Sequence, residues 1–330
     1  MTMKITKPFW HPSNSKAFIL DWDGVLAETQ LDFSDIRERY YGGKKALLLE
    51  EAFTLTESDR KSLMKDLHEL EMAGAERATA VPGAIELTEK LYSEGIPFCI
   101  VSRNSAESIQ SAAKNIGIKL PEHVFDRDNS KWLKPDPRSF FHASKMMGVA
   151  PGDCVAIGDF LYDLQCARRA GIRAVLVQRD EPEWEEWADA SFPTLLDLIK
   201  DFEDPTPIVP WEYREIHAKR GDKWMNSAKE LILTLPEKVS PNLDCWLCRA
   251  AALGIDAIQV SSDAVFSVTD WKDSQSFSPK YMGHPMAEVI QDFLAVRYPM
   301  VRVVTDPEIE GLRSPKNSLD LMRFLERKIF

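Results

Sequence analysis

Cysteine and positive charge are both scarce in this sequence of 330 residues. Its 5 cysteines are an odd number without the regular spacing of a disulfide framework, so we expect free thiols in a reducing cytoplasm. The 41 Lys and Arg residues are outnumbered by 52 Asp and Glu, and neither half of the chain is basic. Binding to nucleic acid or to an anionic membrane surface needs concentrated positive charge, so neither partner is expected.

Long apolar runs are also missing. No stretch of about 18 apolar residues marks a membrane span, and the N-terminus is too polar for a secretory signal. The apolar runs that do occur are short, and several of them end in charged or polar residues. Most of the candidate catalytic and binding residues follow shortly after these runs.

The first such run, residues 17–20, is followed directly by Asp21, Asp23 and Gly24. Side chains at positions i and i+2 of an extended chain point the same way, and glycine lets the backbone turn sharply and approach a ligand. Like charges this close need a cation or a shared proton, and oxygen ligands suit Mg²⁺. The pair therefore predicts a metal-dependent site. An ordinary Asp/Gly turn is the alternative that this segment alone leaves open.

Two further segments place polar groups after short runs. Residues 97–101 end at Ser102, whose hydroxyl can donate to a phosphoryl oxygen, and Asn104 follows closely. Lys134 comes directly before a Pro-Asp-Pro sequence, in which the prolines exclude a helix and fix the local chain. A lysine held in this way supplies a positive charge at a fixed place.

A third run, residues 154–157, ends in Gly158 and Asp159, and Asp163 follows one helical turn later. Residues i and i+4 lie on the same face of a helix. Each of these residues has an ordinary interpretation when taken alone, such as a turn-forming serine, a solvated lysine or an acid in the first turn of a helix. Their joint occurrence in this order is hard to attribute to chance.

With these residues in this order, the chain resembles the haloacid dehalogenase superfamily of phosphotransferases. The residues that match its four motifs are, in order, Asp21 with Asp23, Ser102, Lys134, and Asp159 with Asp163. The surrounding residues are similar to the phosphoglycolate phosphatase and β-phosphoglucomutase branch. The resemblance covers residues 15–203 and nothing beyond.

The resemblance implies an α/β fold, a doubly wound parallel sheet with a Rossmann-like core, and the sequence pattern agrees. The strand-like runs are residues 17–20, 97–101, 124–125, 154–157, 172–177 and 190–192. The helical patterns between them are residues 83–94, 105–116, 137–147, 160–170 and 195–199. Strands that alternate with helices of this length favour a parallel sheet. Ligands bind at the carboxyl ends of such strands, which is where all four motifs fall.

The family's mechanism implies a role for each motif residue. Asp21 would be the nucleophile that forms an aspartyl-phosphate, and Asp23 would be the general acid and base. The groups that would bind the phosphoryl group are Gly24, Ser102, Asn104 and Lys134.

The resemblance also implies a Mg²⁺ ion as cofactor. It would bind carboxylate oxygens of Asp21 and Asp159 and the backbone carbonyl of Asp23, with Asp163 behind them. A dehalogenase has no leaving alkoxide to protonate and does not need Asp23, so dehalogenation is not expected.

Residues 27–80 interrupt the core pattern. They contain helical stretches without a strand signal, which predicts an inserted helical cap that closes over the site. The arginines, tyrosines and glycines of residues 37–44 could meet an anionic substrate or could form a solvated turn, and the sequence leaves both alternatives open.

The length of the chain favours two domains. A polar segment with three prolines, residues 203–210, follows the last element of the resemblance and reads as the boundary. We therefore expect four regions. They are a core of residues 1–26 and 81–203, a cap of residues 27–80, a linker of residues 204–210, and a C-terminal domain of residues 211–330.

The C-terminal domain resembles nothing that we recognise, but its pattern is readable as α/β or α+β. Its expected helices are residues 242–253, 285–296 and 317–329, and its expected strands are residues 255–260 and 301–304. Cys245 and Cys248 could be half of a zinc site, but no second pair exists, and packing on a helix is favoured. A homo-oligomer formed through residues 211–330 is a further expectation.

The function predicted from the sequence is a Mg²⁺-dependent phosphatase that acts on a small phosphorylated metabolite. A phosphomutase of the β-phosphoglucomutase type is the first alternative, because it uses the same pair of aspartates and differs only in the acceptor of the phosphoryl group. A catalytically weak regulatory or assembly module, centred on residues 211–330, is the second. The sequence does not identify the substrate.

Overall fold

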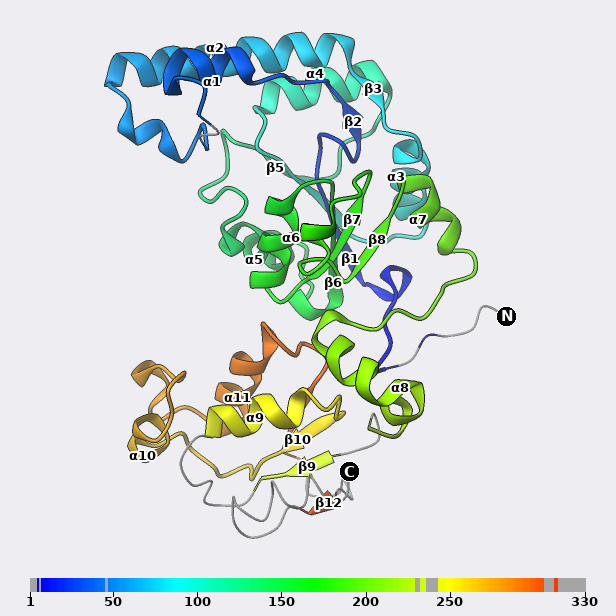
Figure 1. Cartoon of the computed structure of the whole chain (residues 1–330), viewed down its shortest axis with the longest axis vertical. Coiled ribbons are helices and arrows are strands. Elements are labelled where there is room, and N and C mark those ends of the chain that lie inside the picture. Colours follow the sequence, from blue (N-terminus) through cyan, green and yellow to red (C-terminus); the bar gives the residue numbers. More distant parts are fainter. Residues whose placement is uncertain are drawn as a thin grey trace.

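A six-stranded parallel sheet forms the centre of the N-terminal half in the computed structural model (Figure 1). The structure describes residues 5, 7–44, 47–228, 232–235, 243–305 and 312–313. The strands are, in the order of the sheet, β5 (His123–Phe125), β4 (Phe98–Val101), β1 (Ala17–Leu20), β6 (Cys154–Gly158), β7 (Arg173–Val177) and β8 (Ala190–Phe192). The predicted doubly wound sheet is therefore confirmed, with strand ends shifted by one residue at most.

Both faces of this sheet are buried, which explains why its strands are continuous apolar runs. In β1, Phe18 and Leu20 belong to one hydrophobic cluster, while Ala17 and Ile19 belong to another on the opposite face. The helices that supply the first cluster are α3 (Ala84–Ser93), α4 (Ala106–Ile116) and α7 (Leu195–Asp201). The helices that supply the second are α5 (Pro137–Met146) and α6 (Leu161–Arg169).

A helical insertion, residues 27–80, leaves the core between β1 and α3. It contains α1 (Ser34–Tyr41), the 3₁₀ turn η2 (Glu51–Thr54) and α2 (Glu57–Arg77), and it has a small apolar cluster of its own. Figure 1 shows α2 lying along α4 of the core. The expectation of no strand here was wrong, because β2 (Ala27–Glu28) pairs antiparallel with β3 (Thr79–Ala80) where the insertion begins and ends. Strands of two residues are too short to show an alternating pattern.

The C-terminal half has a second parallel sheet, at the end of the molecule opposite α2 (Figure 1). Its strands are, in sheet order, β11 (Arg302–Val304), β10 (Ala257–Gln259), β9 (Ile232–Thr234) and β12 (Leu312–Arg313). Its helices are α8 (Arg214–Ala228), α9 (Leu243–Ala251), α10 (Val268–Lys272) and α11 (Met286–Ala295). This half is therefore α/β. The helix predicted over residues 317–329 lies outside the described residues.

The two cysteines of α9 differ in exposure. Cys248 packs against the C-terminal core, whereas Cys245 is exposed, so packing explains only Cys248. In the described part of the chain, no helix is long and apolar enough to cross a membrane.

Candidate active site

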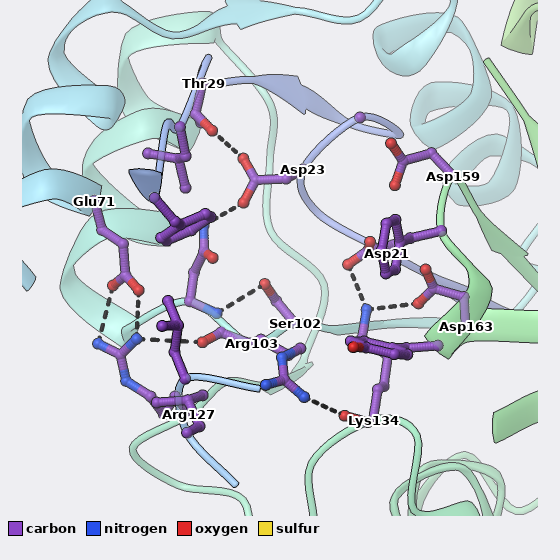
Figure 2. A pocket seen from close by; sticks show the side chains of 18 of the residues that line it. Asp21, Asp23, Thr29, Glu71, Ser102, Arg103, Arg127, Lys134, Asp159 and Asp163 are labelled. Atoms are coloured by element: carbon purple, nitrogen blue, oxygen red, sulfur yellow. Dashed lines mark hydrogen bonds and ion pairs between the residues drawn. The ribbon is translucent and has the colours of Figure 1, made fainter. Parts of the chain in front are cut away.

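A pocket of about 470 Å³ lies where the carboxyl ends of β1, β4 and β6 meet the helical insertion. The residues selected from the sequence all line it, and they are Asp21, Asp23, Gly24, Ser102, Asn104, Lys134, Asp159 and Asp163. Figure 2 shows the side chains of Asp21, Lys134 and Asp163 pointing toward one another. Residues more than a hundred positions apart are adjacent here because neighbouring parallel strands end at the same edge of the sheet.

The ammonium group of Lys134 lies between two carboxylates on the floor of the pocket (Figure 2). Its Nζ is 2.5 Å from Oδ1 of Asp21 and 2.7 Å from Oδ1 of Asp163. Burial opposes the charge of the lysine, but the two carboxylates outweigh it and raise the pKa of Lys134 above its usual value. The side chain is 3% exposed, so it is a fixed positive charge beside Asp21.

The carboxyl group of Asp23 faces away from this lysine. Its Oδ1 accepts a hydrogen bond from Oγ1 of Thr29, and its Oδ2 accepts one of 2.5 Å from Nδ2 of Asn104. Burial raises the pKa of Asp23 to about 7, against the two hydrogen bonds, and the nearby charge of Asp21 adds to the rise. A carboxyl group with this pKa can both give and take a proton near neutral pH.

Asp159 and Gly24 are in close contact at the ends of β6 and β1. Burial and the charge of Asp21 raise the pKa of Asp159 to about 6, although Nη2 of Arg179 lies 2.9 Å from its Oδ2. Gly24 has a φ of +74°, and a Cβ added there would lie 2.2 Å from the same Oδ2. Only glycine fits this turn without displacing the carboxylate.

Three carboxylates could hold a metal ion. One oxygen each of Asp21, Asp159 and Asp163 lies within 4.8 Å of the others. Hard oxygen ligands of this kind suit Mg²⁺. Because the carboxyl group of Asp23 is held by Thr29 and Asn104, this residue could offer only its backbone carbonyl.

Ser102 directly follows β4 and is 3% exposed. Its Oγ accepts a hydrogen bond of 3.2 Å from the backbone N–H of Asn104. This contact fixes the turn that carries both side chains into the pocket.

Sequence reasoning missed the arginines that link the core to the insertion. Arg103 forms an ion pair with Glu50, with Nη2 2.8 Å from Oε2, and it also donates to the backbone carbonyl of Lys134. Arg127 forms a buried pair with Glu71 of α2 (Figure 2). The position of Arg103, next to Ser102 of the second motif, could have indicated that it lies at the site. Nothing in the sequence, however, indicates that Arg103 pairs with Glu50 or that Arg127 pairs with Glu71.

The cationic segment of the insertion, residues 37–44, divides between the pocket and the surface. Arg37 lines the pocket. Arg39 and Tyr40 instead contact Asp66 of α2, at 2.5 Å and 2.8 Å. Only Arg37 of these residues is therefore placed to meet a substrate, and contact with an anionic substrate stays a prediction.

A family model and several known proteins match the N-terminal half of the chain. A family model described as haloacid dehalogenase-like hydrolase matches residues 15–171. Hexitol phosphatase A of Escherichia coli is 27% identical over 189 residues, which are 52% of this chain and 88% of that protein. A phosphoglycolate phosphatase of Thiobacillus denitrificans is 26% identical over 213 residues, 56% of this chain and 94% of that protein. The crystal structure of a hydrolase from Pseudomonas syringae is similar with a TM-score of 0.49 at 23% identity, covering 57% of this chain and 97% of that one.

Proposed function

Because residues 15–171 belong to the haloacid dehalogenase-like hydrolases, we propose that this chain hydrolyses phosphate monoesters of a small molecule through a phosphorylated Asp21. Its relatives include proteins named as phosphatases, and the chain is an enzyme of that type. One observation carries the mechanism. Asp21 lies 2.5 Å from a buried lysine, while Asp23 has a raised pKa and is held in another direction.

The first half of the reaction transfers the phosphoryl group to the enzyme. A carboxylate oxygen of Asp21 attacks phosphorus, and the bond between phosphorus and the ester oxygen breaks. Asp23 gives its proton to the departing alkoxide, which its pKa of about 7 permits at neutral pH. Lys134 and Ser102 are placed to donate to the phosphoryl oxygens as their charge is redistributed.

The second half releases phosphate. Asp23, now ionised, takes a proton from a water molecule that attacks the phosphorus of the aspartyl-phosphate. The bond from phosphorus to Asp21 breaks, and inorganic phosphate leaves. Thr29 and Asn104 keep the carboxylate of Asp23 in one place through both halves.

A divalent cation fits this donor set. We assign it to carboxylate oxygens of Asp21 and Asp159 and the backbone carbonyl of Asp23, with Asp163 kept in position by Lys134. When bound, Mg²⁺ would neutralise charge on the phosphoryl oxygens. The helical insertion would act as the cap that excludes bulk water from the site.

The test is phosphate release from a panel of phosphate monoesters in the presence of Mg²⁺. Asp21→Asn keeps the shape of the side chain and removes the nucleophile, so we expect a loss of about a thousandfold or more. Asp153→Asn, on the surface beside Lys16, is the matched control and should retain full activity. Asp21→Asn with activity like that of the control would overturn the assignment. Sugar phosphates that isomerise without releasing phosphate would indicate a phosphomutase instead.

A further inference from the structure

Part of the lining of this pocket is apolar, and we call it the apolar wall. The apolar and aromatic side chains that line it come from the insertion and from the segment after β6, and they include Phe33, Leu47, Leu48, Leu49, Phe160 and Tyr162. Phe160 is 41% exposed although it is large and apolar. Its ring lies edge-on to Tyr162, with centroids 4.9 Å apart, and to Trp184, with centroids 5.0 Å apart. This group of rings offers a surface on which another ring can pack.

The polar side chains around this wall mostly have partners already. In the described part of the chain, Arg103 is paired with Glu50, and Arg127 is paired with Glu71. Glu28 and Gln30 also line the pocket, but both are exposed. A sugar or polyol would place hydroxyl groups against the apolar wall, where the leucines, Phe33 and Phe160 offer no hydrogen-bond partner, which disfavours binding.

Arg37 differs from the other pocket arginines in having no ion pair with a described carboxylate, whereas Arg103, Arg127 and Arg179 each have one. The Nε of Arg37 is buried without a hydrogen-bond partner among the described residues, as is that of Arg127, and the guanidinium of Arg37 lies 5.7 Å from the centre of the Phe33 ring. Its charge also acts on Tyr162. Burial raises the pKa of that tyrosine, and the charges of Arg103 and Arg37 oppose the rise. Arg37 therefore brings an unpaired positive charge to the apolar wall.

Arg37 is half-buried and has no ion pair with a described carboxylate, so its guanidinium is free to bind an anion that enters the pocket. Guanidinium groups match the oxygens of carboxylates and phosphates and bind them with two parallel hydrogen bonds. Arg39 lies on the same helix but is paired with Asp66 outside this pocket. The contrast within α1 shows that Arg37 alone of the two is available to a ligand in the pocket.

We propose that the substrate is a phosphate monoester whose organic part is an aromatic ring bearing a second oxyanion, with the ring packed beside Phe160 and the oxyanion bound by Arg37. This inference rests on the proposed phosphatase function and names its substrate class. It separates the chain from phosphatases of sugars and polyols, because selectivity comes from an apolar wall and one cation instead of hydroxyl-binding groups.

The experiment compares kcat/KM for phenyl phosphate, para-carboxyphenyl phosphate, the para-bisphosphate of benzene and a hexitol phosphate. We expect kcat/KM to be higher for phenyl phosphate than for the hexitol phosphate. For at least one ester with a second oxyanion, kcat/KM should be about tenfold or more above that of phenyl phosphate. This factor corresponds to the free energy of a hydrogen bond to a charged group. The carboxylate and the bisphosphate distinguish the two kinds of oxyanion.

Arg37→Met should bring the ratio between the anionic ester and phenyl phosphate to about one, and Arg37→Lys should restore part of it. Arg39→Met is the control and should keep the ratio of the wild type. Phe160→Ala should lower the ratio of phenyl to ethyl phosphate by about three- to tenfold. A ratio is insensitive to partial loss of folded protein.

Two results would overturn this inference: a hexitol phosphate preferred over phenyl phosphate, or a preference for the anionic ester that survives Arg37→Met. Failure of the proposed function would differ from both. In that case the wild type would hydrolyse no ester, or Asp21→Asn would hydrolyse them as well as the wild type.

Discussion

The carboxylate of Glu71 holds the helical insertion to the core. It accepts hydrogen bonds from both Nη atoms of Arg127 and one of 3.0 Å from the backbone N–H of Ser105, at the start of α4. The two side chains are 2% and 6% exposed. Glu71→Gln would leave the guanidinium of Arg127 buried opposite a neutral amide.

The expected cost follows from this burial. Removing one partner of a buried ion pair costs about 3–5 kcal/mol, because the remaining charge is left without compensation. Glutamine keeps one acceptor oxygen, so we expect the lower end, about 3 kcal/mol. Every 1.4 kcal/mol is about tenfold in an equilibrium constant, so the insertion should open about a hundredfold more often. The effect should concentrate in α2, whose largest packing contact is with α4.

Native-state hydrogen exchange of the α2 amides measures this opening. Glu69→Gln is the matched control, because Glu69 lies on the same helix in an exposed pair with Lys65 at 3.4 Å, worth at most about 1 kcal/mol. If α2 exchanges no faster in Glu71→Gln than in the control, the buried pair does not hold the insertion. Replacing both Glu71 and Arg127 by Met should recover part of the protection, since no charge is then left unpaired, while the backbone N–H of Ser105 still loses its acceptor.

Three other predictions follow from the structure. Gly24→Ala would place a Cβ 2.2 Å from Oδ2 of Asp159 at a φ of +74°, so we expect about 1–2 kcal/mol of destabilisation and weaker Mg²⁺ binding. An unchanged melting temperature and Mg²⁺ affinity would contradict this. Burial lowers the pKa of His11 below its usual 6.5, although its contact with Asp201 opposes the shift. The unfolded chain therefore binds more protons, stability should fall as the pH drops below about 6.5, and urea unfolding of His11→Asn should show a weaker dependence on pH. Arg179 occupies an oxygen of Asp159 at 2.9 Å, so Arg179→Gln should tighten Mg²⁺ binding a few-fold in calorimetry, and equal or weaker binding would refute this role.

The sheet and the motif residues could be predicted from the sequence because both follow from local patterns. A strand buried on both faces must be apolar throughout, so residues 17–20 and 154–157 were recognisable, and the first polar residue after each marks its carboxyl end. Parallel neighbours end at one edge, which brings Asp21 and Asp159 together without any knowledge of side-chain packing. Gly158 extends β6 by one residue beyond the prediction, because its backbone still pairs with Leu176 of β7.

The contacts that hold the helical insertion could not be predicted in this way. Glu71 and Arg127 are separated by 56 residues and meet only because α2 lies along α4. Nothing in their local sequence distinguishes them from the many charged residues that stay solvated. The same limit applies to Arg37, because a shift of two positions along α1, about half a helical turn, decides whether an arginine lines the pocket or pairs with Asp66.

A buried ion network joins the two halves of the chain, which the proline-rich segment separates in sequence. Arg173 of β7 is 2% exposed and contacts Asp189 at 3.0 Å and Glu212, from beyond the prolines, at 2.7 Å. Burial opposes the charge of Arg173, and the two carboxylates outweigh it and raise its pKa. Without Glu212, only Asp189 would compensate the charge of this guanidinium, beside β6, the strand that Asp159 directly follows. Glu212 therefore contributes to the stability of the N-terminal half, because it compensates the buried charge of Arg173.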